Sequence, residues 1–154
     1  MVVILGIAAV ITVPMIAGTS DLQATLASRQ IVSTLLFMQT ACITKQETYQ
    51  MVFDSAADSY SVQDAAGNVI DDPVIAGKQM QLSYPDSPDL SHITLNSASF
   101  NATDRIWFNR LGEPYAGNPA VNNPMTTGTI VLQSGDKQIT LTVEPVTGRV
   151  TVSE

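Results

Sequence analysis

The side chains that most often carry enzyme chemistry are few in this sequence and widely spaced. There is one histidine, His92, and one cysteine, Cys42. The residues around His92 do not form a serine–histidine–aspartate arrangement, and the sequence has no glycine-rich phosphate loop and no G-x-S-x-G or H-E-x-x-H motif. We expect His92, at the start of a short predicted strand, to be structural or exposed, and the sequence predicts a protein that is not an enzyme.

The lone cysteine sets limits on covalent and metal chemistry. It excludes an intrachain disulfide, and one cysteine with one histidine cannot supply the four ligands of a structural zinc site. Free cysteines usually pack as small apolar residues, and Lys45, three residues after Cys42, gives only weak support for an activated thiol. We therefore expect Cys42 to lie in the core.

Carboxylates gather around one predicted hairpin and the turn after it. Asp54, Asp58 and Asp64 belong to the hairpin, and Asp71 and Asp72 come next. Carboxylates clustered in loops can bind calcium, but the D-x-D-x-D-G spacing of a calcium loop is absent. The sequence therefore favours solvated turns over a metal site, and no cofactor is expected.

Charge is absent from the beginning of the chain. All 7 Lys and Arg and all 14 Asp and Glu come after residue 20, so the net charge of −7 belongs wholly to the remainder of the chain. An acidic surface of this kind repels phosphate backbones and anionic membranes at long range. We therefore expect no nucleic-acid partner.

The opening segment, "MVVILGIAAVITVPMIAG" (1–18), is apolar on every face. A buried core helix, a cleaved secretory signal and a membrane helix are the alternatives. All-round apolarity disfavours a surface helix, and the missing basic residues disfavour a signal peptide. Its length is near the lower limit for spanning a bilayer, and membrane helices tolerate a proline such as Pro14 better than soluble ones do. We predict the body of a membrane helix whose beginning is missing.

A second pattern begins without a break. Apolar residues recur at steps of three or four on one helical face, which predicts packing against a sheet: Ala24, Ala27, Ile31, Leu35, Met38 and Cys42. Leu22, Leu26, Leu36 and Ile43 are expected on its flanks. Because no glycine or proline lies between residues 19 and 66, we predict one helix over about residues 1–47. The same stripe could also serve as a spine for assembly, and the two roles are compatible.

After residue 48 the period changes to two, which is typical of strands. The predicted strands are 49–53, 60–64, 78–84, 92–95, 105–109, 128–134, 137–143 and 148–152. In "RIWFN", Trp107 and Phe108 cannot both face the core of a regular strand, so one of them should cover an edge or a partner. The sequence predicts an α+β fold in which the long N-terminal helix packs on an antiparallel domain of seven to eight short strands.

A long loop is predicted over residues 111–128, rich in Asn, Gly and Pro. Long ordered loops are often functional, although a tolerated surface excursion is the alternative. The candidate interaction residues in this loop are Gly112, Tyr115, Gly117 and Gly128.

Taken together, these segments resemble the type IV pilin-like proteins, and within them the GspH/FimT group of minor pseudopilins and minor pilins. The resemblance is carried by the apolar helix with Gly6 eight residues before Pro14, by "LASRQIVSTLLFMQTACITKQETY", and by "IWFNRLGEP" and "GTIVLQSGDKQITLTVEPVTGRVTV" near the end. It covers nearly the whole chain.

The resemblance implies a structural subunit without catalysis, in a type II secretion pseudopilus or a type IV pilus. Residues 1–18 would form the membrane and filament-core helix segment, and residues 19–154 a periplasmic domain, with the amphipathic helix at 19–48 and the β domain at 49–154. Small residues such as Gly6 and Ala9 would allow close helix approach, and Pro14 would mark a point where the helix can melt during packing.

The resemblance also implies partners and a location. The subunit would be held in the bacterial inner membrane by a single pass before assembly, and would contact other pilins or pseudopilins through its N-terminal helix. An inner-membrane assembly platform would act on it, and a prepilin peptidase would cleave and methylate the precursor. Because the family places a glutamate about nine residues before the glycine, we expect a leader and a few mature residues to be encoded upstream of Met1.

Two alternatives stay open. The first is a DNA-uptake pilin of the same fold, although only Arg110, Lys137 and Arg149 could supply cations near the C-terminal "GR" turn. The second is a signal-anchored periplasmic binding protein or enzyme, for which converging titratable groups would be needed.

Overall fold

The computed structural model describes the backbone of residues 2–154 and the side chains of residues 19–154. A single helix, α1 (Val2–Lys45), opens the chain. Its end is set locally, because Gln46 adopts a left-handed backbone with φ 56°, and the Gln46 side-chain amide donates to the Ile43 carbonyl at 2.7 Å. That bond satisfies one of the carbonyls left open at a helix C-terminus. The helix therefore ends two residues earlier than predicted.

Polar residues on the buried side of α1 satisfy their hydroxyls within the helix. Ser28 donates to the Thr25 carbonyl at 2.8 Å and Thr34 donates to the Gln30 carbonyl at 2.9 Å. Both side chains are buried. Because these two hydroxyls are satisfied within the helix, Ser28 and Thr34 can be buried without the cost of an unpaired donor.

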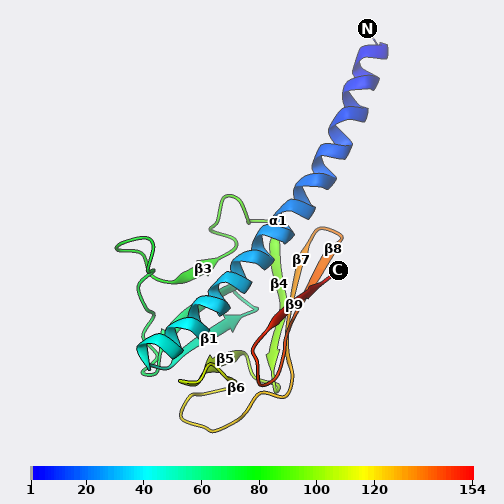
Figure 1. The fold of residues 1–154 in the computed structure, drawn as a ribbon. Coiled ribbons are helices and arrows are strands. Elements are labelled where there is room, and N and C mark those ends of the chain that lie inside the picture. The colour runs from blue at the N-terminus through cyan, green and yellow to red at the C-terminus, as the bar shows by residue number, and fades with distance from the viewer. Residues whose placement is uncertain (1) are drawn as a thin grey trace.

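Two antiparallel sheets come after the helix. One has the strand order β3-β2-β1-β5-β6 and the other β4-β7-β8-β9. Figure 1 shows the second half of α1 lying across the strands, while its first half runs on beyond them. The strands are β1 (Tyr49–Asp54), β2 (Ser59–Asp64), β3 (Gln81–Ser83), β4 (Ile93–Phe100), β5 (Arg105–Phe108), β6 (Pro114–Ala116), β7 (Gly128–Ser134), β8 (Lys137–Val143) and β9 (Val150–Ser153).

The structure confirms the predicted α+β class, with differences in detail. Residues 49–154 hold nine strands instead of seven or eight. The additional strand, β6, lies inside the predicted loop 111–128 and pairs with β5 through Trp107 and Tyr115. Pro114 begins this edge strand, where a missing N–H is tolerated. Its three residues are too few for a period-two pattern to show in the sequence.

Several strands also begin or end at other residues than predicted. β4 extends to Phe100, five residues past the predicted end, and passes a bulge between Leu95 and Ser97. The bulge adds one residue and breaks the alternation on which the prediction depended. β3 is shorter than predicted, because residues 78–80 pair only through isolated bridges and turns.

The core lies between α1 and the inner faces of both sheets. Phe53 of β1 stacks on Phe100 of β4 with ring centroids 5.7 Å apart, which joins the two sheets. Phe108 is fully buried in this core, whereas the adjacent Trp107 points to the outer face and stacks on Tyr115 at 4.5 Å. As predicted, these two aromatic residues lie on opposite faces of the strand.

Near its end, α1 is tied to two connecting loops by one side chain. The amide nitrogen of Gln39 donates to the carbonyls of Gly112 and Thr147, each at 2.8 Å. Gly112 and Gly148 both have positive φ values, 83° and 67°, and a Cβ at Gly112 would lie 2.7 Å from Ile43 Cδ1. The positive φ favours glycine at both positions, and at Gly112 a side chain would also have to displace the end of the Ile43 side chain.

Candidate functional site

The outward face of α1 carries a row of exposed apolar side chains. Leu22, Leu26, Leu36 and Ile43 are 58%, 42%, 50% and 45% exposed. Their spacing follows alternating steps of four and three through Arg29, Ser33 and Thr40, which keeps one line on a helix surface. We call these four residues the outer stripe. They lie on the side of α1 opposite the core residues, and not on the flanks as predicted. At 100° per residue, Leu22 lies about half a turn from Ala24, and Leu36 lies about half a turn from Met38.

A groove of about 350 Å³ separates α1 from β9. One lining residue, Val152, comes from β9, and the other five come from α1 and are of mixed polarity: Ser28, Arg29, Val32, Ser33 and Leu36. Val152 is half exposed there. The groove therefore runs alongside the outer stripe and shares Leu36 with it.

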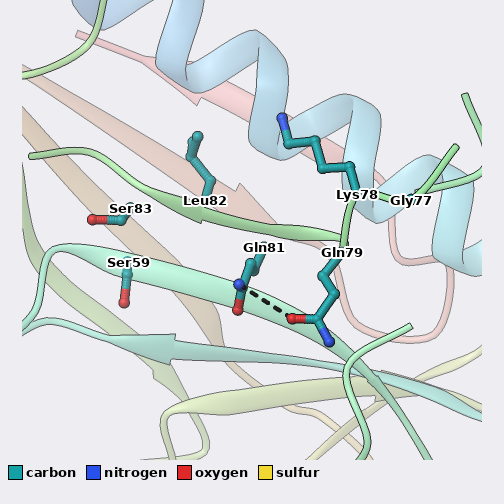
Figure 2. Close-up of a pocket in the computed structure, with 7 residues that line it drawn as sticks. All are labelled: Ser59, Gly77, Lys78, Gln79, Gln81, Leu82 and Ser83. Carbon is teal, nitrogen blue, oxygen red and sulfur yellow. Dashed lines mark hydrogen bonds between the residues drawn. The ribbon is translucent and has the colours of Figure 1, made fainter. Parts of the chain in front are cut away.

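A larger, polar pocket of about 660 Å³ lies beside β3 (Figure 2). Its lining consists of Ser59, Gly77, Lys78, Gln79, Gln81, Leu82 and Ser83. The Gln81 amide donates to the Gln79 side-chain oxygen at 3.4 Å, as Figure 2 shows. Lys78 is the one ionisable residue in this lining, so the pocket holds no acid–base pair for proton transfer.

A third hollow, of about 430 Å³, lies where α1 ends and contains the titratable residues Glu47, Tyr49, Asp64 and Arg110. The Tyr49 hydroxyl donates to the Glu47 carboxylate. That carboxylate, together with burial, raises the pKa of Tyr49 to about 12. Backbone and side-chain donors of Asn68 hold the pKa of Asp64 below its usual range. A tyrosine with a raised pKa stays protonated at neutral pH, so Tyr49 is not activated as a nucleophile.

The carboxylates of the hairpin region bond to backbone amides. Asp54 accepts from Ala56 and Ala57, each at 3.0 Å, and Asp72 accepts from Val74 and Ile75 at 2.8 and 3.1 Å. In the same way, Asp64 accepts from Ala66 and Asn68, and Asp58 accepts from Leu95. These bonds stabilise turns and hold loops. No group of three metal-ligating side chains gathers anywhere in the part of the chain whose side chains are described.

The two residues with the greatest potential for chemistry lie apart. His92 is exposed in the turn before β4, and Cys42 is fully buried in the core. Burial raises the pKa of the Cys42 thiol, although a bond from the Tyr49 backbone opposes the shift. A buried thiol with a raised pKa is unreactive.

The residues predicted to pack the helix on the sheets are all in the core. Ala27, Ile31, Met38 and Cys42 have no exposed surface and Leu35 has 1%. Gly6, Ala9 and Pro14, predicted for the membrane or filament helix, lie outside the residues whose side chains the structure describes. Within residues 19–154, no helical segment has the length and apolarity needed to cross a membrane.

The four residues of the predicted interaction loop are mostly engaged in internal packing. Gly112 lies against the helix and Gly128 against Met125 and Phe100. The Gly117 N–H donates to the Arg105 carbonyl at 3.0 Å, and Tyr115 is half-buried against Trp107. Gly112, Tyr115 and Gly117 lie in or next to β6, whereas Gly128 begins β7 in the other sheet, so the four residues do not form one surface.

The long helix packed on two antiparallel sheets places the chain in the α+β class. No family model and no curated protein sequence matches this chain. Among solved structures, the minor pseudopilin EpsH from the Type 2 Secretion System of Vibrio cholerae superposes with a TM-score of 0.58 at 12% identity, over 85% of this chain and 96% of that chain. The type IV minor pilin FimU of Pseudomonas aeruginosa superposes with a TM-score of 0.52 at 12% identity, over 88% and 92%. The chain thus has the fold of minor pseudopilins and minor pilins.

Two parts of this surface were not predicted from the sequence. The groove between α1 and β9 joins residues more than a hundred positions apart, so no local pattern could reveal it. The outer stripe had a usable signal, because the alternating steps of four and three from Leu22 to Ile43 are visible in the sequence. The structure shows that this row stays largely uncovered, although Leu36 borders the groove beside Val152 and Ile43 lies near Gly112.

Proposed function

We propose that this chain is a non-catalytic structural subunit, a minor pilin or minor pseudopilin, of a type IV pilus or a type II secretion pseudopilus. The observation that supports the proposal is the outer stripe. Its four large apolar side chains are 42–58% exposed on the helix of a fold shared with such subunits. Large apolar side chains that stay exposed in one line along a helix offer a contact surface for another macromolecule, and the stripe lies on the helix that leads back to the apolar segment 1–18.

In this proposal, residues 1–18, with Gly6, Ala9 and Pro14, form the membrane segment and then the filament core. Residues 19–154 form the periplasmic domain. The subunit is held in the inner membrane until an assembly platform inserts it beside other pilins, after a prepilin peptidase has processed the precursor. The subunit helps to initiate assembly of the filament, or takes part in the export of protein by the pseudopilus.

The described surface offers little to the alternatives. Lys137 pairs with Glu154, Arg149 lies 3.5 Å from Glu144, and Arg110 lines a hollow with Glu47 and Asp64. Cations matched by carboxylates do not form the basic patch that DNA binding needs.

The test compares Leu36→Glu with Gln30→Glu in the bacterium that encodes the chain. Both add one negative charge to an exposed position of α1, but only Leu36 belongs to the outer stripe. Leu36→Glu should lower the amount of the subunit in sheared filaments several-fold, while Gln30→Glu leaves it unchanged and thermal melts show both variants folded. Equal incorporation of both variants would contradict the proposal.

A further inference from the structure

The two edges of the four-stranded sheet differ. β4 lies at one edge, where the Leu95 N–H donates to the Asp58 side chain at 2.6 Å and a bulge comes directly after it. A side-chain cap and a bulge are devices that prevent an edge from pairing with another strand. β9 lies at the other edge, and its four residues are half-buried or exposed.

The register of β9 on β8 shows which backbone groups point outward. Glu144 N–H donates to the Arg149 carbonyl at 2.8 Å and the Glu144 carbonyl accepts from Gly148 N–H at 3.0 Å, so Glu144 is a residue of the β8 side that bonds toward the β9 side. Bonded and non-bonded pairs alternate in an antiparallel ladder, so Val143↔Val150 and Leu141↔Val152 are non-bonded pairs. The N–H and C=O groups of Val150 and Val152 therefore point away from β8, toward the free edge.

The same two valines direct their side chains toward the helix. Their cross-strand partners, Val143 and Leu141, are buried in the core, and cross-strand partners share one face of a sheet. Val150 packs at the margin of that core, while Val152 lines the groove beside Leu36. An additional strand on this edge would thus place every second side chain in the groove, beside Val152 and Leu36.

The helix side of the groove adds a charge. Arg29 lines it and is exposed, and among the described residues no ion pair engages this guanidinium. Its neighbours one turn away on α1, Thr25, Leu26, Val32 and Ser33, carry no carboxylate. A carboxylate from outside would therefore complement it.

We propose that β9 accepts an extended strand of another filament protein, with apolar side chains at alternate positions and a carboxylate opposite Arg29. Hydrogen bonds to Val150 and Val152 give the pairing, and the groove and Arg29 give the side-chain selectivity, as in other cases of strand addition. A docking helix could not use these edge groups, because its own backbone is internally bonded. The inference deepens the proposed function by naming a partner's chemistry, and rests on it only for the source of the strand.

The test uses the full chain in detergent micelles and two synthetic peptides. The probe is a short acetylated peptide of alternating valine and threonine with an aspartate at one end. The control peptide has the same sequence with alternate backbone amides methylated, so that it cannot donate. The unmodified peptide should bind, measured by fluorescence anisotropy, and should slow amide exchange at Val150 and Val152 in NMR spectra. The control peptide should bind about tenfold more weakly, as expected for losing one or two hydrogen bonds.

Matched variants distinguish the contribution of the β9 backbone edge to peptide binding from the contribution of the groove side chains. Val152→Pro removes a free-edge N–H without removing a bond to β8, so it should weaken binding about as much as methylation does, whereas Val152→Thr keeps the N–H and most of the affinity. Arg29→Glu should weaken binding of the aspartate peptide and strengthen binding of a lysine counterpart. If Val152→Pro fails to fold, the methylated peptide still decides.

Equal binding of the two peptides, or no binding, would overturn the inference. So would protection of Val150 and Val152 that rises with protein concentration without peptide, because a second copy would then occupy the edge. If peptide binding fails while filament incorporation still depends on Leu36, only this inference is lost. If the peptide binds but incorporation does not depend on Leu36, the filament role is lost instead.

Discussion

At the scale of single residues, Gly148 shows how closely the C-terminal loop approaches the core. Its φ is 67°, and a Cβ added there would lie 2.8 Å from Phe108 Cε1 and 3.1 Å from the Gln39 amide nitrogen. Gly77 also has a positive φ, 76°, but no atom lies within 4 Å of the corresponding Cβ position. A side chain at Gly77 would therefore meet backbone strain alone, whereas a side chain at Gly148 would meet both backbone strain and steric contact.

We expect Gly77→Ala to lower the free energy of unfolding by about 1–2 kcal/mol, the cost of a left-handed alanine. Gly148→Ala should cost about 1–3 kcal/mol more, because the core must also shift. Urea denaturation of both variants measures the difference. Equal losses would show that the loop moves away from Phe108 freely.

Tyr49 gives a prediction about pH. The Glu47 carboxylate disfavours the phenolate and raises the pKa of Tyr49 from 10.0 to about 12 in the folded protein. Because the folded pKa lies above the unfolded one, the stability that this bond contributes is present below pH 10 and is lost as the pH rises toward 12. An NMR titration of tyrosine Cζ resonances should show the Tyr49 pKa falling toward 10 in Glu47→Gln. An unchanged pKa would mean that burial and not the carboxylate sets it.

At the scale of elements, α1 is joined to two loops far apart in the sequence through Gln39. Removing this side chain by Gln39→Ala loses two bonds of 2.8 Å, and should lower the free energy of unfolding by about 1–2 kcal/mol. The loss is moderate because Thr147 is exposed and water can reach its carbonyl. The adjacent Thr40→Ala, at an exposed position, should change it by less than about 0.5 kcal/mol.

Hydrogen exchange offers a second measurement of the same contact. Amides in the loops around Gly112 and Thr147 should exchange faster in Gln39→Ala, while amides of β7 and β8 remain protected. Uniform acceleration across the sheets would indicate global destabilisation, and the local role of Gln39 would then be wrong.

At the scale of the whole molecule, charge is strongly asymmetric. Residues 49–89 hold seven carboxylates and one cation, Lys78, and so carry −6 of the net charge of −7. The β2–β3 side of the domain is therefore acidic, whereas residues 19–48, with two cations and two carboxylates, have no net charge. This distribution opposes contact with a polyanion.

We expect duplex DNA binding to be negligible at about 150 mM salt. Fluorescence anisotropy with a labelled duplex provides the measurement, and Arg110→Ala and Arg149→Ala should change nothing. Micromolar affinity that falls in either variant would favour the DNA-uptake alternative.

Much of the molecule was predictable because the interactions that set it are local or periodic. The 3.6-residue period fixed α1 and the buried face containing Ile31, Leu35 and Met38, and the period of two fixed most strands. Strand β6 was not predicted, because its three residues pair only with β5 and show no pattern of their own. The end of β4 was not predicted, because a bulge interrupts its alternation.

By itself, the sequence determined the fold class, the change from an apolar to an amphipathic helix, the core-facing stripe and the acidic surface, since each depends on composition or on spacing along one element. Tertiary structure alone decided how much of the opposite side of α1 stays exposed. It also decided that Val152 comes to lie beside Arg29 and Leu36, and that one edge of the four-stranded sheet is capped while the other is open. These depend on how wide a sheet one helix can cover and on which strands become neighbours, and such relations arise only when distant segments pack together.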